Sequence, residues 1–538
     1  MKTSNSKTKA FVFWGASFVL FIALLLTGCP QSIENKPNIP SGPDPNLRIE
    51  GGVLKGYNEP PSGALVIPAG VTEIANSAFQ YCTSLTQVNF PASLTKIGNN
   101  AFYGCTGLTS LNLPASLETL NDFAFYGCTE ITGTVTLPAN LKTIGIYAFY
   151  GCKKVDAFDF TQCTQLTSID SGAFGNCTKI TAVTLPKSLK MIAGNAFSGC
   201  TALTTLTVDA ASTHLSSQDN IVYDFNKTKL LCRAPNVTQV TFPPTLTEIA
   251  VYAFKDCTSL TQVNFPASLT KLGGYAFYGC TGLTSLTLPA SLETLNYKAF
   301  SGCTEITGTV TLSANLKTIG GYAFSNCNKV DAFDFTHCTQ LTYIDSGAFG
   351  NCTKITAVTL PKSLKTIAGD TFSGCTALTT LTVDAASTHL SSQDNIVYDF
   401  NKTKFLCRAP NVTQVTFPPT LTEIADSAFS GCTSLTQVNF PASLTKIGGY
   451  AFSGCTEITG TVTLSANLKT IGGYAFYNCN KVDAFDFTHC TQLTYIDIGA
   501  FASCKADAVF TVKAGGNVKN LLLNSHSGIK ASQITEVP

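Results

Sequence analysis

Apolar and polar positions along this chain repeat with a period of about 23 residues. The stretch from Cys82 to Gly104, CTSLTQVNFPASLTKIGNNAFYG, contains one period, and variants of it follow one another to about residue 504. A fixed period of this size indicates one supersecondary unit per repeat, which buries its apolar face only by stacking on its neighbours. The period is marked by sixteen phenylalanines: Phe79, Phe102, Phe125, Phe149, Phe174, Phe197, Phe254, Phe277, Phe300, Phe324, Phe349, Phe372, Phe429, Phe452, Phe476 and Phe501.

The order of residues within one period predicts the path of the chain. Over residues 85–90, apolar residues alternate with polar ones, as in a strand with one face against a core. Pro91 ends this strand because it lacks the N–H donor that a ladder requires. Leu94 and Ile97 begin a second, shorter apolar segment on the opposite wall, and the phenylalanine fills the centre of the coil. We therefore expect a β-rich solenoid in which the sixteen phenylalanines stack along one axis.

The spacing of the phenylalanines groups the coils into larger blocks. Within the solenoid, residues 71–504, the series of spacings that begins at Phe79 begins again at Phe254 and at Phe429, so blocks start near residues 71, 246 and 421. Each of the first two blocks ends in a longer gap between phenylalanines, and this gap contains a β-hairpin pattern, at 220–232 and again at 395–407. We expect these hairpins to project from the stack or to lengthen one coil. The third block is one coil shorter, which modular stacking permits.

Residues 1–28 have the features of an export signal. A basic start is followed by an apolar run over residues 11–26, which is too short for a good membrane-spanning helix. The motif LTGC at residues 26–29 resembles a bacterial lipobox, and this resemblance implies that Cys29 is acylated and becomes the lipid anchor. An ordinary cleaved signal is the alternative. Pro30 favours transport beyond the inner membrane, so we expect a lipid-anchored protein of the cell envelope, at the outer membrane or cell surface.

Three further segments flank the solenoid. Residues 29–48 contain five prolines and little apolar content, which predicts an extended tether. Residues 49–70 have a strand-like pattern, and residues 505–538 break the repeat. Because the end coils of a solenoid would otherwise expose their apolar faces, we expect these two segments to be the N-terminal and C-terminal caps.

Each of the sixteen phenylalanines is followed three residues later by a cysteine, from Cys82 to Cys504. Zinc sites use close cysteine pairs, whereas these cysteines come once per coil, so we expect no metal site. The column is instead predicted to consist of buried thiols that pack as small apolar groups. Parallel Cβ vectors make disulfides between adjacent coils awkward, but occasional bridges in an oxidising compartment stay an open alternative.

Composition narrows the classes of function. The chain has 34 basic and 33 acidic residues, and only 12% of its residues are charged, so it offers no basic stripe and nucleic acid is not an expected partner. Its five histidines are spread over the blocks, and no phosphate-binding loop, dinucleotide motif or metalloprotease motif occurs in the sequence. We therefore expect no enzyme activity and no cofactor.

Outward-facing polar residues on the long strand are the candidate recognition sites. They recur in consecutive coils, as the binding wall of a solenoid requires, but a solvated β-face is the alternative. A pair of aspartates also recurs once per block. Two carboxylates are too few for calcium, so the pair is either a charged recognition patch or solvated surface. The candidate residues are Gln87, Asn89, Ser110, Asn112, Asp156, Asp159, Asp331, Asp334, Asp483 and Asp486.

The repeated phrase also carries a family resemblance. The pattern LxxVxFPxSLTxIGxxAFxGCT, the hairpin sequence Asn-Ile-Val-Tyr-Asp-Phe and the lipobox together resemble the BspA-like leucine-rich repeat proteins of host-associated bacteria, over about residues 65–504. The resemblance implies a right-handed leucine-rich repeat stack and a surface protein that mediates adhesion. Ser313 and Ser465 depart from the pattern because they replace proline. The partner is expected to bind the solenoid itself.

Three functions follow as hypotheses, of which the first is favoured. The first is a lipid-anchored adhesin or scaffold that binds extracellular host or bacterial proteins through the solenoid wall, with glycans as a further class of partner. The second is a structural or self-assembling protein of the cell envelope without a dedicated ligand. The third uses the threonine-rich face as a regular array that binds carbohydrate or ice.

Overall fold

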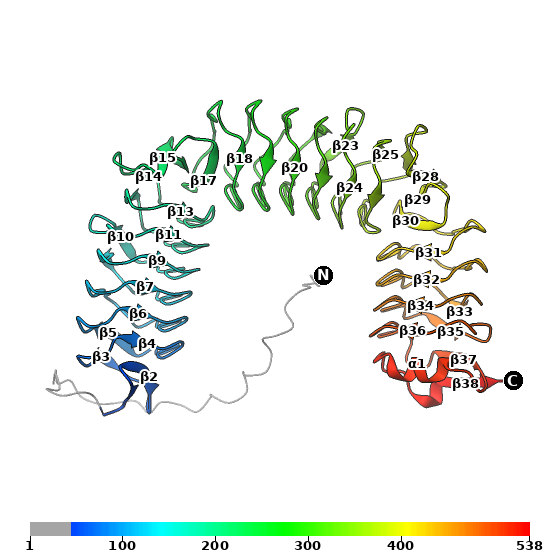
Figure 1. Ribbon diagram of the computed structural model, residues 1–538, viewed down its shortest axis with the longest axis horizontal. Helices are drawn as coiled ribbons and strands as arrows, with labels where there is room; N and C mark the ends of the chain where they lie inside the picture. The colour runs from blue at the N-terminus through cyan, green and yellow to red at the C-terminus, as the bar shows by residue number, and fades with distance from the viewer. Residues whose placement is uncertain (1–44) are drawn as a thin grey trace, which may run out of the picture. The chain divides into compact units, whose positions relative to one another are not determined.

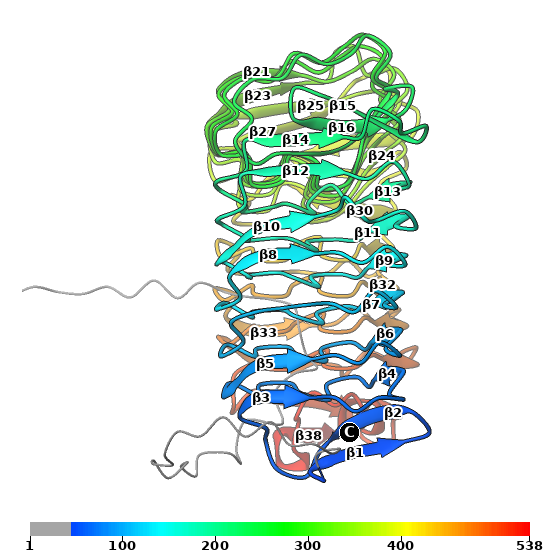
Figure 2. The same cartoon turned by 90° about the vertical axis from the view of Figure 1, so that its left-hand side faces the viewer.

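The computed structural model describes residues 45–538, and these residues form a stack of short coils (Figure 1). Each coil contributes a segment of a long wall on one side and a two-residue strand on the other (Figure 2). The β-rich solenoid predicted from the period is therefore confirmed. Among the described residues, no helix is long and apolar enough to cross a membrane.

The two-residue strands form parallel ladders, and each block has one ladder that begins with antiparallel strands. The first ladder contains β1 (Leu47–Glu50), β2 (Val53–Tyr57), β4 (Glu73–Ile74), β6 (Lys96–Ile97), β7 (Thr119–Leu120), β9 (Thr143–Ile144), β11 (Ser168–Ile169) and β13 (Met191–Ile192). The second contains β15 (Leu215–Gln218), β16 (Ile221–Asp224), β17 (Lys229–Arg233), β18 (Glu248–Ile249), β19 (Lys271–Leu272), β20 (Thr294–Leu295), β22 (Thr318–Ile319), β24 (Tyr343–Ile344) and β26 (Thr366–Ile367). The third contains β28 (Leu390–Gln393), β29 (Ile396–Asp399), β30 (Lys404–Arg408), β31 (Glu423–Ile424), β32 (Lys446–Ile447), β34 (Thr470–Ile471) and β36 (Tyr495–Ile496).

Strands of the long wall pair only in small groups. The coil between β5 and β8 has no strand there, and its Thr109 instead donates both its N–H and its hydroxyl to the carbonyl of Thr86, at 3.0 and 3.1 Å. The pairs are β3 (Gly63–Val66) with β5 (Leu85–Asn89), β8 (Gly133–Thr136) with β10 (Val155–Asp159), β12 (Ala182–Leu185) with β14 (Thr205–Val208), β21 (Gly308–Thr311) with β23 (Val330–Asp334), and β25 (Ala357–Leu360) with β27 (Thr380–Val383). The last group joins β33 (Gly460–Thr463), β35 (Val482–Asp486), β37 (Val509–Lys513) and β38 (Ile534–Val537).

The turn around each phenylalanine, from three residues before it to two after it, is hereafter called the Phe turn. Its alternate N–H groups point along the stack. Ser77, Phe79 and Tyr81 donate to the carbonyls of Asn99, Ala101 and Tyr103 of the next coil, at 2.8, 2.8 and 2.7 Å. The residue two after the phenylalanine has a positive φ in all sixteen turns, and the residue two before it does so in fourteen. Glycine adopts this left-handed conformation without strain, which explains the recurring Gly before the cysteine.

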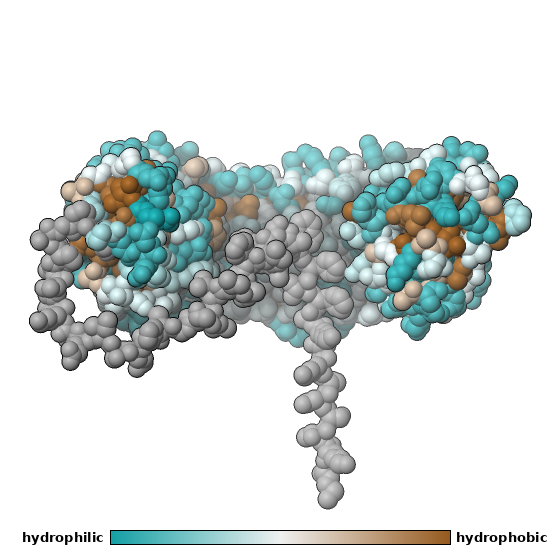
Figure 3. Space-filling view, turned by 90° about the horizontal axis from the view of Figure 1, so that it is seen from below, coloured by the Kyte–Doolittle hydropathy of each residue, from teal (hydrophilic) through white to brown (hydrophobic). Residues whose placement is uncertain are grey.

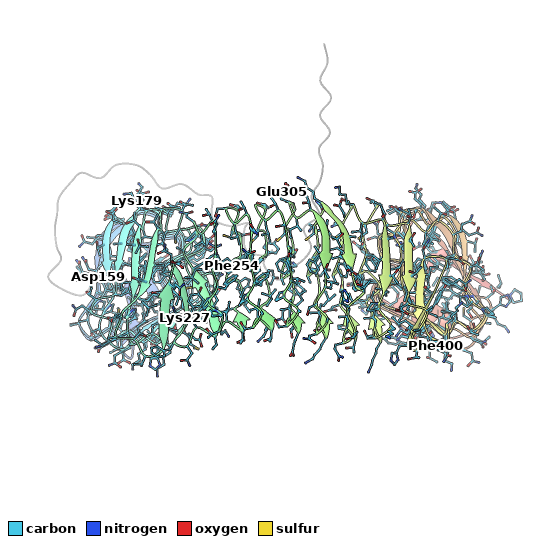
Figure 4. All side chains as sticks on the ribbon, turned by 90° about the horizontal axis from the view of Figure 1, so that it is seen from above. Asp159, Lys179, Lys227, Phe254, Glu305 and Phe400 are labelled. Atoms are coloured by element: carbon cyan, nitrogen blue, oxygen red, sulfur yellow. The ribbon has the colours of Figure 1, made fainter. Side chains whose placement is uncertain are left out.

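The phenylalanines stack face to face in three columns rather than one. Within the first column, Phe79, Phe102 and Phe125 have ring centroids 5.1 Å apart, and the buried side chains of the described residues divide into three apolar clusters, about one per block. Phe254 lies inside its coil, whereas Lys179, Glu305 and Phe400 lie at the periphery (Figure 4). The expected single axis is therefore wrong in detail. The columns are interrupted where the long gaps between phenylalanines place antiparallel strands between two coils.

These antiparallel strands separate one apolar cluster of the stack from the next. In β16 and β17, Val222 and Cys232 pack on the first cluster, whereas Tyr223 and Leu230 pack on the second. β17 then takes the place of a two-residue strand, because Leu230 pairs with Ile249. The insert lengthens a coil, which was one of the two predicted outcomes, and it has a third strand, β15, that the hairpin pattern did not include.

Each block starts with the same device. A side chain covers the first phenylalanine ring of the block. It lies three residues after the residue that pairs with the block's first two-residue strand, as Arg233 follows Leu230, which pairs with Ile249. Arg233 places its guanidinium carbon 5.4 Å from the ring centre of Phe254, and Arg408 repeats this over Phe429 at 5.5 Å. At the N-terminal cap, the ring of Tyr57 takes this place over Phe79, at 6.0 Å. The N-terminal cap and the two inserts are thus structurally equivalent.

The cysteines form the predicted column of buried thiols. All 21 cysteines of the described residues are free, and only Cys504 is partly exposed. The thiol of Cys105 donates to the carbonyl of Phe79 in the preceding coil at 3.1 Å, and this contact recurs along the column. Burial raises the pKa of Cys105, Cys200 and Cys375 to about 12. The thiols are therefore neutral structural donors.

The C-terminal cap replaces the missing next coil. It contains α1 (Val518–Asn524), a 3₁₀ turn (Ala531–Gln533) and strand β38. The N–H of Gly499 donates to the carbonyl of Ser525 at 2.7 Å, and the N–H of Phe501 donates to the hydroxyl of Ser527 at 3.1 Å. The cap thereby accepts the hydrogen bonds that a further Phe turn would have accepted.

Replacing Phe300 by alanine is expected to destabilise the second block selectively. Phe300 is fully buried between Phe277 and Phe324, at 5.2 and 5.6 Å, so its loss should cost about 3–5 kcal/mol. Hydrogen exchange should report the loss of amide protection within the second cluster, because solenoid repeats couple mainly to their neighbours. F400A, at a ring 54% exposed, is the control and should change stability little. Equal loss of protection in all three blocks would contradict separate clusters.

The buried thiols predict destabilisation at alkaline pH. A thiol whose pKa is raised on folding stabilises the protein fully below the unfolded pKa of about 8.5, and this stability is lost between that value and the folded pKa. Replacing Cys105, Cys200 and Cys375 by alanine should lessen the fall in unfolding free energy above pH 8.5 by about 1.4 kcal/mol per pH unit for each thiol removed. Urea unfolding at pH 7, 9 and 10 measures this, and an unchanged pH dependence contradicts it.

Candidate binding surfaces

The predicted residues of the long wall lie at the surface but are partly engaged within the chain. Gln87 and Asn89 both belong to β5, and the Gln87 amide donates to Asn89 Oδ1 at 3.1 Å. Ser110 and Asn112 lie in a coil that has no strand at this place, so the expectation of a strand there is wrong. Here the single threonine at position 109 links the coil to the preceding one through Thr86 O, and no strand pairing accompanies this link. Whether these four residues bind a partner stays a prediction.

Threonine hydroxyls on this wall serve the stack. Thr109 donates to the carbonyl of Thr86, Thr132 to that of Thr109, and Thr284 to that of Thr261, each at 3.1–3.3 Å. A hydroxyl that donates to the neighbouring coil has lost its proton donor for a ligand. The threonine column is therefore explained by coil-to-coil bonding.

The first aspartate of each predicted pair is a link between three coils. Asp156 accepts a hydrogen bond from the N–H of Gly133 in the preceding coil at 3.1 Å and pairs with Lys179 of the following coil at 3.1 Å. The Lys179 ammonium lowers the pKa of Asp156. Corresponding contacts connect Asp331 with Lys354 and Asp483 with Lys505, at 3.0 and 2.7 Å.

The second aspartate of each pair closes a turn at the end of its strand. Asp159, Asp334 and Asp486 each accept the N–H of the threonine two residues later, at 2.9 Å. The hydrogen bonds from Thr336 lower the pKa of Asp334. The two carboxylates of a pair thus have separate partners, and no group of three or more potential metal ligands occurs in the described part of the chain.

Two shallow clefts lie at the proline end of the long wall. One, of about 370 Å³, is lined by Asp159, Phe160 and Lys187 among others, and the other, of about 270 Å³, by Asn112 and Gln162. Each cleft lies between consecutive coils and includes one predicted site residue. At these two clefts the wall is hollowed and could accept a side chain of a partner.

A second surface, which the sequence analysis missed, lies along the Phe turns. Thirteen of the 18 tyrosines stand within these turns, and none of the thirteen is buried. Tyr103, Tyr126 and Tyr150 stack on one another with ring centroids 4.7 and 5.0 Å apart. We call this surface the tyrosine edge; its members are Tyr81, Tyr103, Tyr126, Tyr147, Tyr150, Tyr252, Tyr275, Tyr278, Tyr297, Tyr322, Tyr450, Tyr474 and Tyr477.

Several aromatic residues of these turns have a strained backbone. Phe123, Tyr147, Tyr252, Tyr275, Tyr322, Tyr450 and Tyr474 all stand two residues before a phenylalanine with φ between 53° and 64°. The left-handed conformation is unfavourable for a bulky residue by roughly 1–2 kcal/mol. Glycine and asparagine occupy the same position elsewhere, for example at Gly172 and Asn100. Strain that is accepted at a partly exposed side chain is a recognised feature of functional surfaces.

Differences between the blocks concentrate on this edge. Residues 71–245 and 246–420 align without a gap and differ at 23 positions. The Phe turns supply 30 of the 175 aligned positions, apart from the phenylalanines themselves, but contain 14 of these 23 differences. The strand segments of the long wall differ only at Asn112, which is Thr287 in the second block. The wall is thus a repeated structural surface, whereas the tyrosine edge varies along the stack.

The tips of the two inserts add a third exposed feature. Phe225 and Phe400 follow β16 and β29 and are each 54% exposed. The hairpin pattern in the sequence could have indicated that these two rings are exposed, since a residue at the turn of a hairpin lies away from the core. They occupy the same position in the inserts of the first and second blocks.

Comparison with known families settles the class of repeat. Residues 57–162, 131–231, 227–340, 317–395 and 398–528 match the family described as BspA type leucine rich repeat region (6 copies). The chain belongs to this family. As a BspA-type leucine-rich repeat protein, it carries this repeat over nearly all of the described residues. The lipobox cysteine, Cys29, and the tether up to residue 44 lie outside the described residues. The last two residues predicted for the tether, Leu47 and Arg48, belong instead to strand β1.

Several solved structures are similar to this BspA-type chain. A leucine rich cell surface protein from Faecalibacterium prausnitzii A2-165 is 22% identical, with a TM-score of 0.47, and the match covers 64% of this chain and 96% of that one. The pneumococcal vaccine antigen PcpA is 21% identical, with a TM-score of 0.46 and coverage of 75% and 97%. A leucine-rich repeat protein from Bacteroides ovatus ATCC 8483 is 21% identical, with a TM-score of 0.32 and coverage of 91% and 98%. No curated protein matches the chain.

The strain at the tyrosine edge predicts that Tyr450 is not needed for stability. Tyr450 is 48% exposed, has φ +56° and stacks only on Tyr474, at 5.1 Å, and the first block has Asn100 at the same position with the same φ. Y450N should leave the unfolding free energy unchanged within ~0.5 kcal/mol or raise it by up to ~1 kcal/mol, because asparagine tolerates this backbone. Urea unfolding tests this. A loss above ~1 kcal/mol would show that the ring is a structural element.

Proposed function

We propose that this BspA-type protein binds a host or bacterial protein through the outer surface of its solenoid, and that the tyrosine edge makes the main contact. The observation that carries the proposal is that thirteen partly exposed tyrosines gather in the Phe turns. Several of them occupy positions of positive φ, where a tyrosine adds backbone strain. Tyrosine is enriched at the energetic centre of protein interfaces because its ring gives a large contact area and its hydroxyl a hydrogen bond.

Variation along the stack supports a role of this edge in specificity. A partner that spans several coils meets a different set of side chains in each Phe turn, whereas the long wall offers nearly the same side chains in both blocks. Specific recognition requires such differences between neighbouring contact positions. The predicted wall residues, Gln87 and Asn89 among them, are the alternative contact surface.

The proposal includes the cell envelope as the site of action. The LTGC motif places the acylated cysteine at Cys29, ahead of a proline-rich tether. An anchor at one end and a tether over residues 29–48 would allow the solenoid to meet partners outside the membrane. The adhesive role that the family resemblance implies agrees with this arrangement.

A second candidate function, self-assembly, is favoured by one observation. The two end faces of the stack show apolar side chains surrounded by polar ones (Figure 3). Val509 and Leu523, near the C-terminus, are 39% and 40% exposed. Sedimentation of the purified chain at increasing concentration distinguishes this function, because only end-to-end assembly predicts species that grow with concentration.

The binding test compares two variants of residues 43–538, which form a compact unit. Y103S/Y126S removes two stacked tyrosines and introduces serines that the chain already has at the same positions, Ser453 and Ser301. N89A/N112T changes the long wall in a matched way. We expect saturable binding to host extracellular matrix or to partner bacteria, weakened at least tenfold by Y103S/Y126S and unchanged by N89A/N112T.

Each other outcome has a defined meaning. Loss of binding only in N89A/N112T would assign the contact to the wall and overturn the role of the tyrosine edge. Absence of saturable binding by the wild-type chain to every matrix and bacterial sample would contradict the adhesive function. Thermal unfolding of both variants confirms that they are folded.

A further inference from the structure

A cavity of about 470 Å³ lies where the first block meets the second. Tyr147 and Tyr150 line it from the first block and Tyr252 from the second, and small residues such as Ser198 and Gly199 lie between them. It is larger than the two clefts of the long wall, and its size falls in the range of about 300–1,000 Å³ that is typical of small-molecule sites. Its three tyrosines also belong to the tyrosine edge.

The cavity exists because two coils at the end of the first block lack large side chains. A Cβ atom at Gly172 would lie 2.3 Å from Cε1 of Tyr147, and one at Gly175 would lie 2.6 Å from Cδ2 of Tyr150. The two rings therefore lie over the next coil, where only glycine leaves them room. The following coil contacts the second block directly, since a Cβ at Gly194 would lie 2.2 Å from the carbonyl oxygen of Val251.

Polar groups of several kinds line the cavity. The amide of Asn176 donates to the hydroxyl of Tyr150 at 2.6 Å, and the amide of Asn195, which is only 8% exposed, donates to Ser171 Oγ at 2.9 Å. Lys255 and Asp256 form an ion pair of 2.5 Å at the side of the second block. Amides, hydroxyls, an ammonium group and a carboxylate thus provide both donors and acceptors within one small space.

We propose that this cavity binds a terminal sugar residue of a glycan. A sugar has hydroxyls that both donate and accept hydrogen bonds, and this matches a lining that has amides, hydroxyls and charged groups of both signs. Its C–H groups can contact the tyrosine rings, which are amphipathic in the same way. The site goes beyond the proposed protein partner and does not depend on it.

The second junction of the chain supplies an internal comparison. Asn176 and Arg233 have identical counterparts there, Asn351 and Arg408. The guanidinium Nε of Arg233 has no hydrogen-bond partner, and neither does that of Arg408. The unpaired Nε is therefore a feature of the arginine that covers the first phenylalanine of a block, and it does not distinguish the two junctions. Five lining positions differ, and one of them is Asn195, which is Asp370 at the second junction. The other four are Tyr150, Tyr252, Lys255 and Asp256, which are replaced by Ser325, Ser427, Ser430 and Gly431.

This comparison provides a variant whose residues the fold is known to accept. Y252S/K255S/D256G gives the second-block side of the first junction the side chains of the second junction. The backbone suits this change, since Ser427 and Gly431 have φ of 57° and 68° where Tyr252 and Asp256 have 64° and 55°. The probe is a printed array of defined neutral and sialylated oligosaccharides, followed by calorimetric titration with a bound oligosaccharide in free form. We expect one sugar site per wild-type chain and at least a tenfold loss of affinity in the variant.

A gain of function completes the test. S325Y/D370N/S427Y/S430K/G431D introduces the first junction's side chains at the second and should raise the stoichiometry from one to two sugars per chain. Binding of neutral sugars alone or of sialylated sugars alone would both support the site and identify the class. The proposal is overturned if the wild-type chain binds no printed oligosaccharide, or if Y252S/K255S/D256G is folded and binds as well as the wild type. Tyr126 stacks on the cavity residue Tyr150 at 5.0 Å, so the two proposals are distinguished by their readouts, sugar binding in this test and protein binding in the other.

Discussion

The hydrogen bonds between successive Phe turns are the interaction on which this structure depends. Alternate N–H groups of one turn donate to carbonyls of the next, and the phenylalanine rings stack because the same bonds set their spacing. A single coil has no acceptors for these donors, and unpaired buried N–H groups are costly. The coil is therefore stable only with a successor, and every interruption of the stack must supply acceptors or a cover by other means.

The caps and inserts supply these acceptors and covers. At the C-terminal end, Ser525 and Ser527 accept the bonds of the last turn. At the start of each block, a side chain covers the exposed face of the first phenylalanine ring, a tyrosine once and an arginine twice. An arginine over a ring gains a favourable cation–π contact and still reaches carbonyls, as Arg233 does with those of Ala234 and Pro235 at 2.9 and 2.8 Å. The block is thus a structural unit with its own start and its own apolar cluster.

The sequence predicted the repeating parts of the fold because periodic patterns report periodic burial. The coils, the cysteine column and the block length could all be predicted from sixteen copies of one phrase. The equivalence of the N-terminal cap with the inserts could not be predicted. Residues 47–57 pair with the next strand at the same position as the inserts do, but their sequence has little in common with that of the inserts. The absence of a strand around Ser110 and Asn112 was also out of reach, since Leu108 to Leu113 alternates as well as the paired segments do, and only the neighbouring coils decide whether a ladder forms.

The candidate sites show the same limit for a different reason. The wall residues were chosen because they are polar and recur, but recurrence equally marks groups that bond coil to coil, as Asp156 does with Gly133 and Lys179. A binding surface in a repeat protein is better sought where the repeats differ at exposed positions without loss of the fold. Tyr150, which is Ser325 in the second block, meets this criterion, and the space that Tyr147 and Tyr150 occupy is left by Gly172 and Gly175 of the next coil. Each of these two large side chains therefore depends on a small one in the coil that follows, and the cavity forms where such small residues continue for two coils.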